Sequence, residues 1–332
     1  MDRDLQELKS LSAALGGDSA LVQGPGGNTS IKDDDGCMWI KASGTWLCHA
    51  EEQPIFVPLR HAAVMMAIEA GQEALPPEAI LPGGPEGLRP SVETSLHALL
   101  PHRVVAHSHA VNAIVTAVQA NVEALLAERL SGLNWAFVPY CRPGLPLTQS
   151  VAEVVRSRRP DVLLLGNHGL VVGADDGGSA LALTYEVERR LAHPARPAST
   201  KPRNDLPARI QGPWRLPAEG VSHAVAFDDE ALGIARGGSL YPDHVVFLGH
   251  AIATVDEAGA DRDLSACVVP GEGVVLRDDL PPAADWMVHA LSEVTTRLRR
   301  DESLRYLTLE EEAELLNWDA EKYRQALSRK SA

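Results

Sequence analysis

Three histidines carry the side-chain chemistry that stands out in this chain. His107 and His109 lie two residues apart, at the end of an apolar run that follows Arg103. Side chains at positions i and i+2 of a strand share one face and stand about 6–7 Å apart, so both imidazoles could converge on one ion. A bare His-x-His pattern is equally compatible with one core histidine and one surface histidine. Other residues are therefore needed to distinguish a metal site from two unrelated histidines.

His168 is the third candidate ligand. It lies in the glycine-flanked turn Gly166-Asn167-His168-Gly169, between two apolar runs. Two histidines on a strand and one in a distant turn match a catalytic zinc site, in which three protein ligands leave the fourth position open. Neutral imidazoles suit Zn²⁺, and Co²⁺ or Mn²⁺ would also bind. The sequence therefore indicates a divalent transition-metal site at His107, His109 and His168.

Glu93 is the candidate acid or base of this site. It begins a short helix just before the histidine strand, and the short linking segment leaves it near the same end of the sheet. A carboxylate beside a divalent metal could ligate the empty site, or act as a general base when substrate displaces it. The alternative is a solvated glutamate in a first helical turn, where negative charge is favourable.

A glycine-rich segment over residues 24–30 is a candidate anion site. Consecutive backbone N–H groups in such turns form anion-binding concavities. The segment does not match the Rossmann or Walker patterns, and a loop of this kind is usually only a turn. The residues that could add hydrogen-bond donors to it are Asn28, Ser43, Gly44 and Ser91.

The elements that must position these residues alternate between helices and strands, which favours a layered α/β fold. Apolar spacing predicts helices over residues 5–15, 61–70, 91–100, 110–120, 122–130, 148–156 and 179–191. Besides the strand that ends in the histidine pair, short apolar runs predict strands over residues 31–32, 38–42, 55–57, 135–138, 161–165 and 170–172.

Prolines and glycines mark the boundaries between larger parts of the chain. Residues 72–90 carry five prolines and are typical of a surface excursion. A second proline-rich stretch, 194–219, is typical of an extended linker. The pattern predicts a metal-binding domain over residues 1–193 and a C-terminal α/β domain over residues 220–332.

Two segments of the C-terminal part echo earlier ones. Residues 161–172 resemble 265–276, and residues 102–110 resemble 243–251. We interpret the echo as a duplication whose second copy is a shortened, metal-free, degenerate repeat; chance similarity is the alternative. In this alignment Leu248 and Glu272 replace two histidines, and only His250 remains.

Composition excludes several classes of partner. The 332-residue chain has a net charge of −15, which argues against a nucleic-acid partner and against an anionic membrane surface. No apolar stretch approaches the ~20 residues that span a bilayer, and the first residues lack a signal-peptide pattern. The four cysteines are scattered without Cys-x-x-Cys spacing. We therefore expect a cytoplasmic protein without a nucleic-acid or membrane partner.

In this order, the segments resemble the class II aldolase/adducin family, which includes fuculose- and rhamnulose-phosphate aldolases. The resemblance covers about residues 5–192 and rests on Gly27-Asn28-Thr29-Ser30, Lys41-Ala42-Ser43-Gly44-Thr45, Ser91-Val92-Glu93, His107-Ser108-His109-Ala110 and Asn167-His168-Gly169. Further on, Leu240-Tyr241-Pro242-Asp243-His244 and Asn317-Trp318-Asp319 look similar to extended members fused to a dehydrogenase. The resemblance implies a three-layer α/β/α fold with a mostly antiparallel central sheet, in a homo-oligomer (dimer or tetramer).

The resemblance also implies a zinc-dependent lyase of carbohydrate metabolism acting on a small sugar-like substrate. Family members cleave a ketose 1-phosphate reversibly into dihydroxyacetone phosphate and an aldehyde. Zinc held by the residues that match His107, His109 and His168 chelates the substrate oxygens and stabilises the enediolate. Glu93 matches the acid/base residue. The positions that match the family's phosphate loop are Asn28, Ser43, Gly44 and Ser91.

Two departures from the family pattern bear on the reaction. Val92 stands where aldolases commonly carry a second serine, which weakens the phosphate site and leaves a non-phosphorylated substrate open. The proton donor is often a tyrosine of a neighbouring subunit; Tyr140 is the candidate here, with a structural role as the alternative. Ribulose phosphate epimerases typically carry Asp in place of Glu93, whereas decarboxylases and dehydratases share the metal set. A structural, adducin-like protein would lack the three histidines.

Overall fold

The computed structural model describes residues 2–255 and 264–328, and the chain divides into two compact units. The first unit extends to Ala113 and resumes over Leu126–Leu191, whereas the second comprises Ile114–Leu125 and the residues from Ala192 onward. In the described part, no helix is both long and apolar enough to cross a bilayer.

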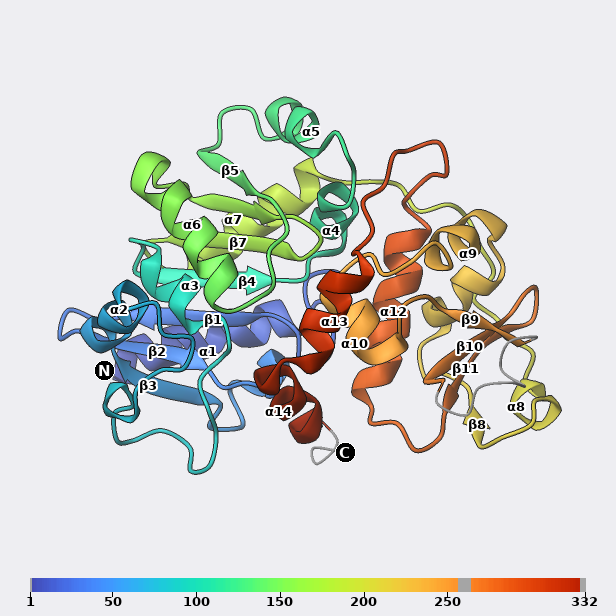
Figure 1. The fold of residues 1–332 in the computed structure, drawn as a ribbon, viewed down its shortest axis with the longest axis horizontal. Coiled ribbons are helices and arrows are strands. Elements are labelled where there is room, and N and C mark those ends of the chain that lie inside the picture. The colour runs from blue at the N-terminus through green and yellow to red at the C-terminus, as the bar shows by residue number, and fades with distance from the viewer. Residues whose placement is uncertain (1, 256–263, 329–332) are drawn as a thin grey trace. The chain divides into compact units, whose positions relative to one another are not determined.

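A seven-stranded sheet forms the middle of the first unit, with strand order β3-β2-β1-β4-β7-β6-β5 (Figure 1). Its strands are β1 (Asn28–Lys32), β2 (Cys37–Lys41), β3 (Phe56–Arg60), β4 (Val104–Ser108), β5 (Trp135–Val138), β6 (Val162–Leu165) and β7 (Gly169–Ala174). Neighbouring strands are antiparallel except β5 and β6, which are parallel. The expected mostly antiparallel central sheet is confirmed.

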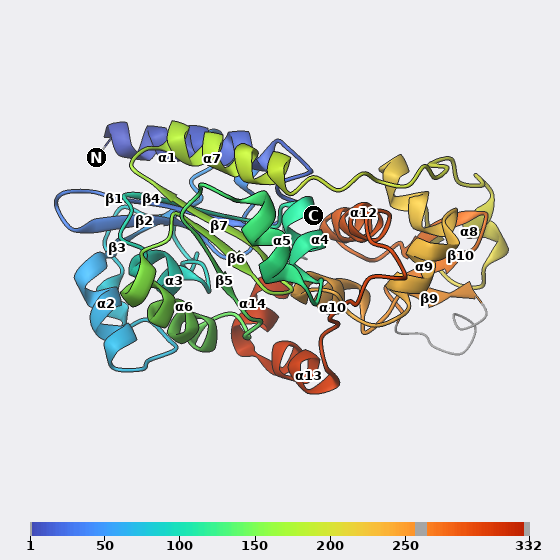
Figure 2. The ribbon, with the colours of Figure 1, turned by 90° about the horizontal axis from the view of Figure 1, so that it is seen from above.

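Helices cover both faces of this sheet (Figure 2). On one face lie α1 (Asp2–Gly16) and α7 (Gly177–Arg190), and on the other lie α2 (His61–Glu69), α3 (Thr94–Leu99) and α6 (Leu145–Arg158). A buried cluster that includes Leu96, Val105 and Val151 joins α3 and α6 to the sheet. The remaining elements up to residue 130 are α4 (Val111–Ala117), α5 (Val122–Arg129), η1 (Leu47–His49) and η2 (Pro77–Ala79). The unit is therefore a three-layer α/β/α domain.

Strand β4 lies in the centre of the sheet, paired with β1 on one side and β7 on the other. All five of its residues are buried. A strand buried on both faces carries a continuous apolar run instead of an alternating one, which explains Val104-Val105-Ala106 before the first histidine. The strand ends at Ser108, so His109 lies just beyond it. The sequence had instead indicated that both histidines belong to the strand.

The second unit has a four-stranded sheet with strand order β8-β11-β10-β9. Its strands are β8 (Trp214–Arg215), β9 (Ala253–Thr254), β10 (Ala266–Val269) and β11 (Gly273–Arg277). Its helices are α8 (Leu206–Arg209), η3 (Gly220–Ala226), α9 (Asp229–Ala235), α10 (Pro242–Leu248), α12 (Ala283–Thr295), α13 (Leu309–Asn317) and α14 (Asp319–Ser328). Two of these elements, α8 and β8, lie in the stretch that the prolines marked as a linker.

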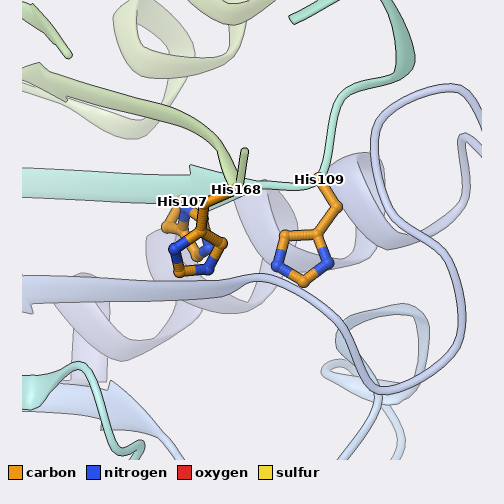
Figure 3. Close-up of side chains that lie close together, drawn as sticks. All are labelled: His107, His109 and His168. Carbon is orange, nitrogen blue, oxygen red and sulfur yellow. The ribbon is translucent and has the colours of Figure 1, made fainter. Parts of the chain in front are cut away.

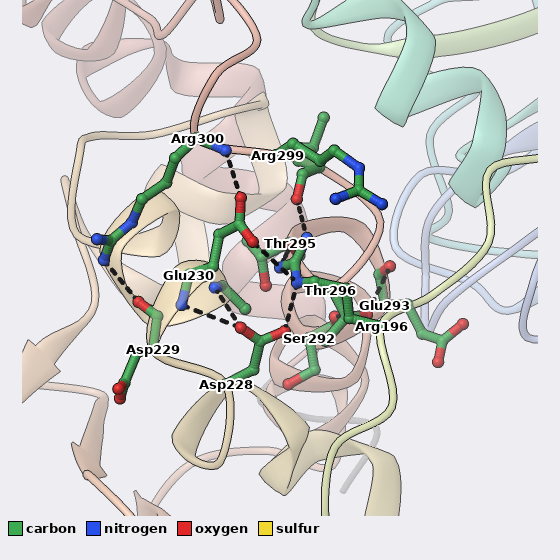
Figure 4. Close-up of polar contacts among 12 residues, drawn as sticks. Arg196, Asp228, Asp229, Glu230, Ser292, Glu293, Thr295, Thr296, Arg299 and Arg300 are labelled. Atoms are coloured by element: carbon green, nitrogen blue, oxygen red, sulfur yellow. Dashed lines mark hydrogen bonds and ion pairs between the residues drawn. The ribbon is translucent and has the colours of Figure 1, made fainter.

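Polar contacts fix the start of that stretch within the second unit (Figure 4). The Arg196 guanidinium donates to the Asp228 carboxylate at 2.7 Å and to the carbonyl of Thr295 at 2.9 Å. Its backbone N–H donates to Thr296 O at 2.9 Å. Arg196, near the start of the stretch 194–219, is therefore tied to α9 and α12.

The two sequence echoes fare differently. Residues 161–172 and 265–276 each fold as an antiparallel hairpin, β6–β7 and β10–β11. Residues 102–110 contain strand β4, whereas 243–251 contain most of helix α10, so this second pairing is wrong. Pro242 at the first turn and Asp243 beside it favour a helix start, which outweighs the β-branched pair that both segments share.

Candidate metal centre

His107 is fixed within the central strand β4. It pairs in register with Val171 of β7, and only 1% of its surface is exposed. Its Nδ1 lies 3.0 Å from Leu170 O. Because a carbonyl can only accept, Nδ1 carries the hydrogen and Nε2 is the nitrogen left to bind a metal.

His168 is presented by the tight turn between β6 and β7. Asn167 adopts a left-handed conformation with φ 50°, which asparagine tolerates better than most residues. A Cβ on Gly169 would lie 2.4 Å from Ser108 O, so only glycine lets the turn approach the end of β4 this closely. The glycine flanks noted in the sequence are thus a packing requirement that brings His168 beside His107.

The glycine-rich loop makes room for His109. A Cβ on Gly26 would lie 2.8 Å from Nδ1 of His109, so the imidazole rests against bare backbone. On the other side of the loop, the buried Lys41 ammonium donates to Pro25 O at 3.0 Å and to Gly27 O at 2.9 Å. The loop is therefore held from within the protein, by a lysine of the family motif to which the sequence assigned no role.

The three imidazoles converge at the end of β4 (Figure 3). Their ring centroids lie 5.1 Å apart for His107 and His109, 4.9 Å for His107 and His168, and 5.5 Å for His109 and His168. One ligand nitrogen from each lies within 4.8 Å of the others; His107 and His168 are buried, and His109 is partly buried. Tetrahedral zinc with bonds of about 2.0–2.1 Å needs nitrogens about 3.4 Å apart, so the set fits a divalent metal with a small contraction.

Glu93 faces this cluster from the residue that precedes α3. Its carboxylate oxygens lie 3.4 Å from His107 Nε2 and 3.3 Å from His168 Nε2. The Asn28 amide donates to the same carboxylate at 2.7 Å. Burial raises the pKa of the Glu93 carboxyl, but His107, His168 and Asn28 outweigh that effect and lower the pKa to about 2. The group is thus an ionised carboxylate directed at the ligand nitrogens, and not a solvated first-turn glutamate.

The other expected site residues differ in what they contact. Ser91 Oγ accepts from the Glu93 N–H at 3.2 Å, so this serine shapes the turn that presents the carboxylate. Ser43 and Gly44 follow β2; the Ser43 N–H donates to Arg89 O at 2.9 Å, and Gly44 has φ 76°. Tyr140 follows β5, and its backbone N would lie 2.7 Å from a Cβ on Gly166. The catalytic role of Tyr140 stays a prediction.

Two further buried groups lie on helices that flank the sheet, His97 on α3 and Glu188 on α7. His97 of α3 lies 2.8 Å from the Ser30 hydroxyl through Nδ1, and burial lowers its pKa to about 3, so it is a neutral structural histidine. Glu188 of α7 accepts from the backbone N–H of Asn112, three residues beyond His109, at 2.8 Å. No spacing rule links residue 188 to a histidine so far away, although a buried glutamate on the apolar face of a helix is itself unusual.

This fold is that of a class II aldolase-type domain, and its three histidines form a group that could hold a metal ion. The chain belongs to the family described as the class II aldolase and adducin N-terminal domain, whose model matches residues 6–193. That match covers the first unit and leaves the C-terminal extension outside it.

The individual relatives described next are 30% identical to this chain or less. A protein of Bacillus subtilis (strain 168) named uncharacterized oxidoreductase YuxG is 29% identical over 202 residues, which are 56% of this chain and 29% of that protein. The chain thus matches less than a third of that curated relative. The N-terminal class II aldolase domain of a Thermoplasma acidophilum protein is 30% identical, covering 57% of this chain and 93% of that one, with TM-score 0.49. A sugar-phosphate aldolase from Thermotoga maritima is 17% identical over 57% of this chain and 93% of that one, with TM-score 0.47.

Proposed function

We propose that the protein is a metal-dependent aldolase, a carbon–carbon lyase that cleaves a small ketose or ketose phosphate by retro-aldol chemistry. The observation that carries this proposal is the convergence of three imidazoles with one ionised carboxylate. Three neutral nitrogen ligands and an adjacent carboxylate suit zinc, with cobalt or manganese as substitutes.

A metal bound there would supply Lewis acidity toward the carbonyl and hydroxyl oxygens of the substrate. The chain's own residues do the rest. His107 is locked by its bond to Leu170 O, so its Nε2 needs no reorientation. The Glu93 carboxylate lies 3.4 Å from His107 Nε2 and 3.3 Å from His168 Nε2, where it accepts the hydroxyl proton as the carbon–carbon bond breaks and the aldehyde leaves.

Asn28 keeps the Glu93 carboxylate in one orientation through its 2.7 Å hydrogen bond. The glycine-rich loop, tied down by Lys41, offers backbone N–H groups to the far end of the substrate. This arrangement supports a substrate with an anionic or hydroxyl-rich tail, and Val92 in place of a second serine extends the proposal to non-phosphorylated ketoses.

The same metal set could serve an epimerase, a decarboxylase or a dehydratase. We favour the aldolase because position 93 is Glu, where the resembling epimerases typically carry Asp. An adducin-like structural role is disfavoured by the three convergent histidines. A cytoplasmic homo-oligomer completes the proposal.

The deciding experiment incubates the zinc-loaded protein with a panel of ketose 1-phosphates, free ketoses and sugar acids. Release of an aldehyde together with dihydroxyacetone or its phosphate is the expected result. Proton NMR of the same mixtures distinguishes the alternatives, because an epimerase interconverts sugars without aldehyde release and a decarboxylase releases carbon dioxide. Turnover by either of those routes, with no aldehyde from any substrate, would replace the aldolase proposal.

A further inference from the structure

His109 is held differently from the other two histidines. His107 sits inside β4, paired with Asn28 of β1 and Val171 of β7. His168 lies in the turn between β6 and β7, where its own N–H donates to Leu165 O at 3.1 Å. His109 belongs to the two-residue link between the end of β4 and the start of α4. Its place therefore depends on what anchors the first turn of α4.

A buried carboxylate anchors that turn. Glu188 of α7 is 8% exposed, and its Oε1 accepts from the Asn112 backbone N–H at 2.8 Å and from the Asn112 amide at 2.9 Å. Its Oε2 accepts from the Ala113 N–H at 3.3 Å. Hydrogen bonds to an ionised carboxylate are about twice as strong as neutral ones. A further hydrogen bond, from the Val111 N–H to Ala20 O at 2.8 Å, fixes the same turn.

The helix that carries Glu188 also packs on the strands that carry the metal site. α7 contacts both β4 and β7. The Glu188 carboxylate therefore belongs to a helix that packs on the same strands that position His107 and the His168 turn.

We propose that Glu188 is a positioning residue of the metal centre. Its carboxylate clamps the backbone of Asn112 and Ala113 and thereby sets the His109 imidazole relative to His107 and His168. The proposal rests on the proposed metal-dependent function. Because metal–nitrogen bonds tolerate little change in length, a link that shifts by about 0.5–1 Å loses one of three ligands while the other two stay in place.

The test uses Co²⁺ as the probe, since its visible spectrum reports coordination as well as occupancy. Glu188→Leu removes the acceptor at similar volume, and Glu188→Gln restores a carbonyl oxygen. The matched control is Glu186→Gln on the same helix, where Glu186 pairs with Arg189 and Arg190 on the surface. Glu188→Leu should weaken Co²⁺ binding about 10- to 100-fold and change the visible bands. Glu188→Gln should recover part of the affinity, and the control should match wild type.

A purely structural role predicts a different result. If Glu188→Leu lowers the unfolding temperature of the metal-free protein but leaves the Co²⁺ affinity and spectrum unchanged, the proposal is overturned. Should the leucine variant fail to fold, Glu188→Ala replaces it, and wild-type Co²⁺ affinity and spectrum in that variant overturn the proposal. His109→Ala separates this failure from failure of the proposed function: if that variant also binds Co²⁺ like wild type, the metal site itself is wrong.

A second inference rests on the two sheets. The partial order β4-β7-β6-β5 in the first unit is antiparallel, antiparallel and parallel. The order β8-β11-β10-β9 in the second unit is also antiparallel, antiparallel and parallel. Within each set of four strands the last in sequence, β7 or β11, is followed by a long helix, α7 or α12.

The hairpin turns agree in conformation as well. Asn167 and Gly271 have φ 50° and 72°, and Gly169 and Gly273 have φ 159° and 141°. Each position in the second turn lies 104 residues after its counterpart (271 − 167 = 104 and 273 − 169 = 104). Glu272 therefore occupies the place of His168.

Strand pairing extends the correspondence to the other histidines. Ala106 pairs with Val172, and Arg215 pairs with Leu276, its counterpart 104 residues on. Residue 106 thus corresponds to 215, an offset of 109, and the same offset relates α4 (Val111–Ala117) to η3 (Gly220–Ala226). By this register Leu216 and Ala218 replace His107 and His109.

We infer that the second unit is a half-copy of the first, without counterparts of β1–β3, whose metal position has been lost. Glu272 instead forms ion pairs with Arg209 and, at 4.0 Å, Arg203. The duplication is the one that the hairpin echo indicated, but its register replaces the incorrect pairing through Leu248 and His250. One chain then binds one metal.

Moving the three histidines tests the register. In a chain with His107, His109 and His168 changed to Ala, the changes Leu216→His, Ala218→His and Glu272→His should restore binding of one Co²⁺. A control with Pro270→His in place of Glu272→His should not bind it. A folded variant that binds no better than the control overturns the inference. If it does not fold, a crystal structure of the native protein decides, since Leu216 must superpose on His107 when the two sheets are aligned.

Discussion

The hydrogen bond between Asn28 and Glu93 gives the sharpest test of how the site works. Both residues are 5% exposed, and the amide lies 2.7 Å from a carboxylate oxygen. Asn28→Leu removes this bond at similar volume. A hydrogen bond to a buried charged group contributes about 1.5–3 kcal/mol, which corresponds to a fall in kcat of about 10- to 150-fold if the bond orients the base in the rate-limiting step.

The assay must separate this role from the phosphate-loop role that the family resemblance implies for Asn28. Steady-state kinetics are measured with a ketose phosphate and with its free ketose. Loss of orientation at Glu93 lowers kcat for both substrates alike, whereas loss of a phosphate contact raises KM for the phosphorylated substrate only. Thr29→Val is the matched control, because it removes the neighbouring 2.6 Å contact with the Ser12 hydroxyl and leaves Glu93 untouched. A KM effect confined to the phosphate, with kcat unchanged, would refute the reasoning.

Four further outcomes are expected. Glu93→Gln should keep the metal and lose at least 100-fold in kcat; unchanged turnover removes Glu93 from the mechanism. His107→Ala should abolish tight metal binding and activity, checked by metal analysis of the dialysed protein. Gly169→Ala should lower the free energy of unfolding in urea by about 1–3 kcal/mol, because its Cβ would lie 2.4 Å from a backbone oxygen. Burial lowers the pKa of His223 to about 4, and its Nδ1 accepts from the Val274 N–H. Between pH 6.5 and 4 the unfolded chain therefore binds more protons, so the free energy of unfolding falls as the pH is lowered through this window, and His223→Gln should flatten the slope.

How far the sequence predicts this site depends on whether each contact is local. The spacing of His107 and His109 after a buried run indicates a shared strand face, and His168 between glycines indicates a turn that can approach it. These signals depend on near neighbours in the chain. The partner of Asn28 is 65 residues away, and no local pattern distinguishes an amide that binds phosphate from one that orients a carboxylate. The contacts of Lys41 and Glu188 likewise join residues that are not neighbours in the chain.

The fold shows the same division. The mostly antiparallel three-layer arrangement was predicted through the family resemblance, and the buried strand before the histidines through its apolar run. The segment 243–251 was misread, because Val-Val is compatible with either a strand or a helix and the surrounding contacts decide. The proline-rich stretch after residue 193 was read as a linker, since the pairing of two residues, Trp214 and Arg215, with β11 leaves almost no periodicity to detect.

The position of β4 in the sheet also bears on the order in which the molecule assembles. The hairpins β1–β2 and β6–β7 each join strands that are close in the chain, so each can form early. Strand β4 closes the gap between them through pairings with segments far away in sequence, which form late because of the entropy of closing long loops. His107 meets His168 only when this central strand has been inserted. Metal uptake is therefore expected only after β4 has been inserted, and a stopped-flow metal indicator would time that step.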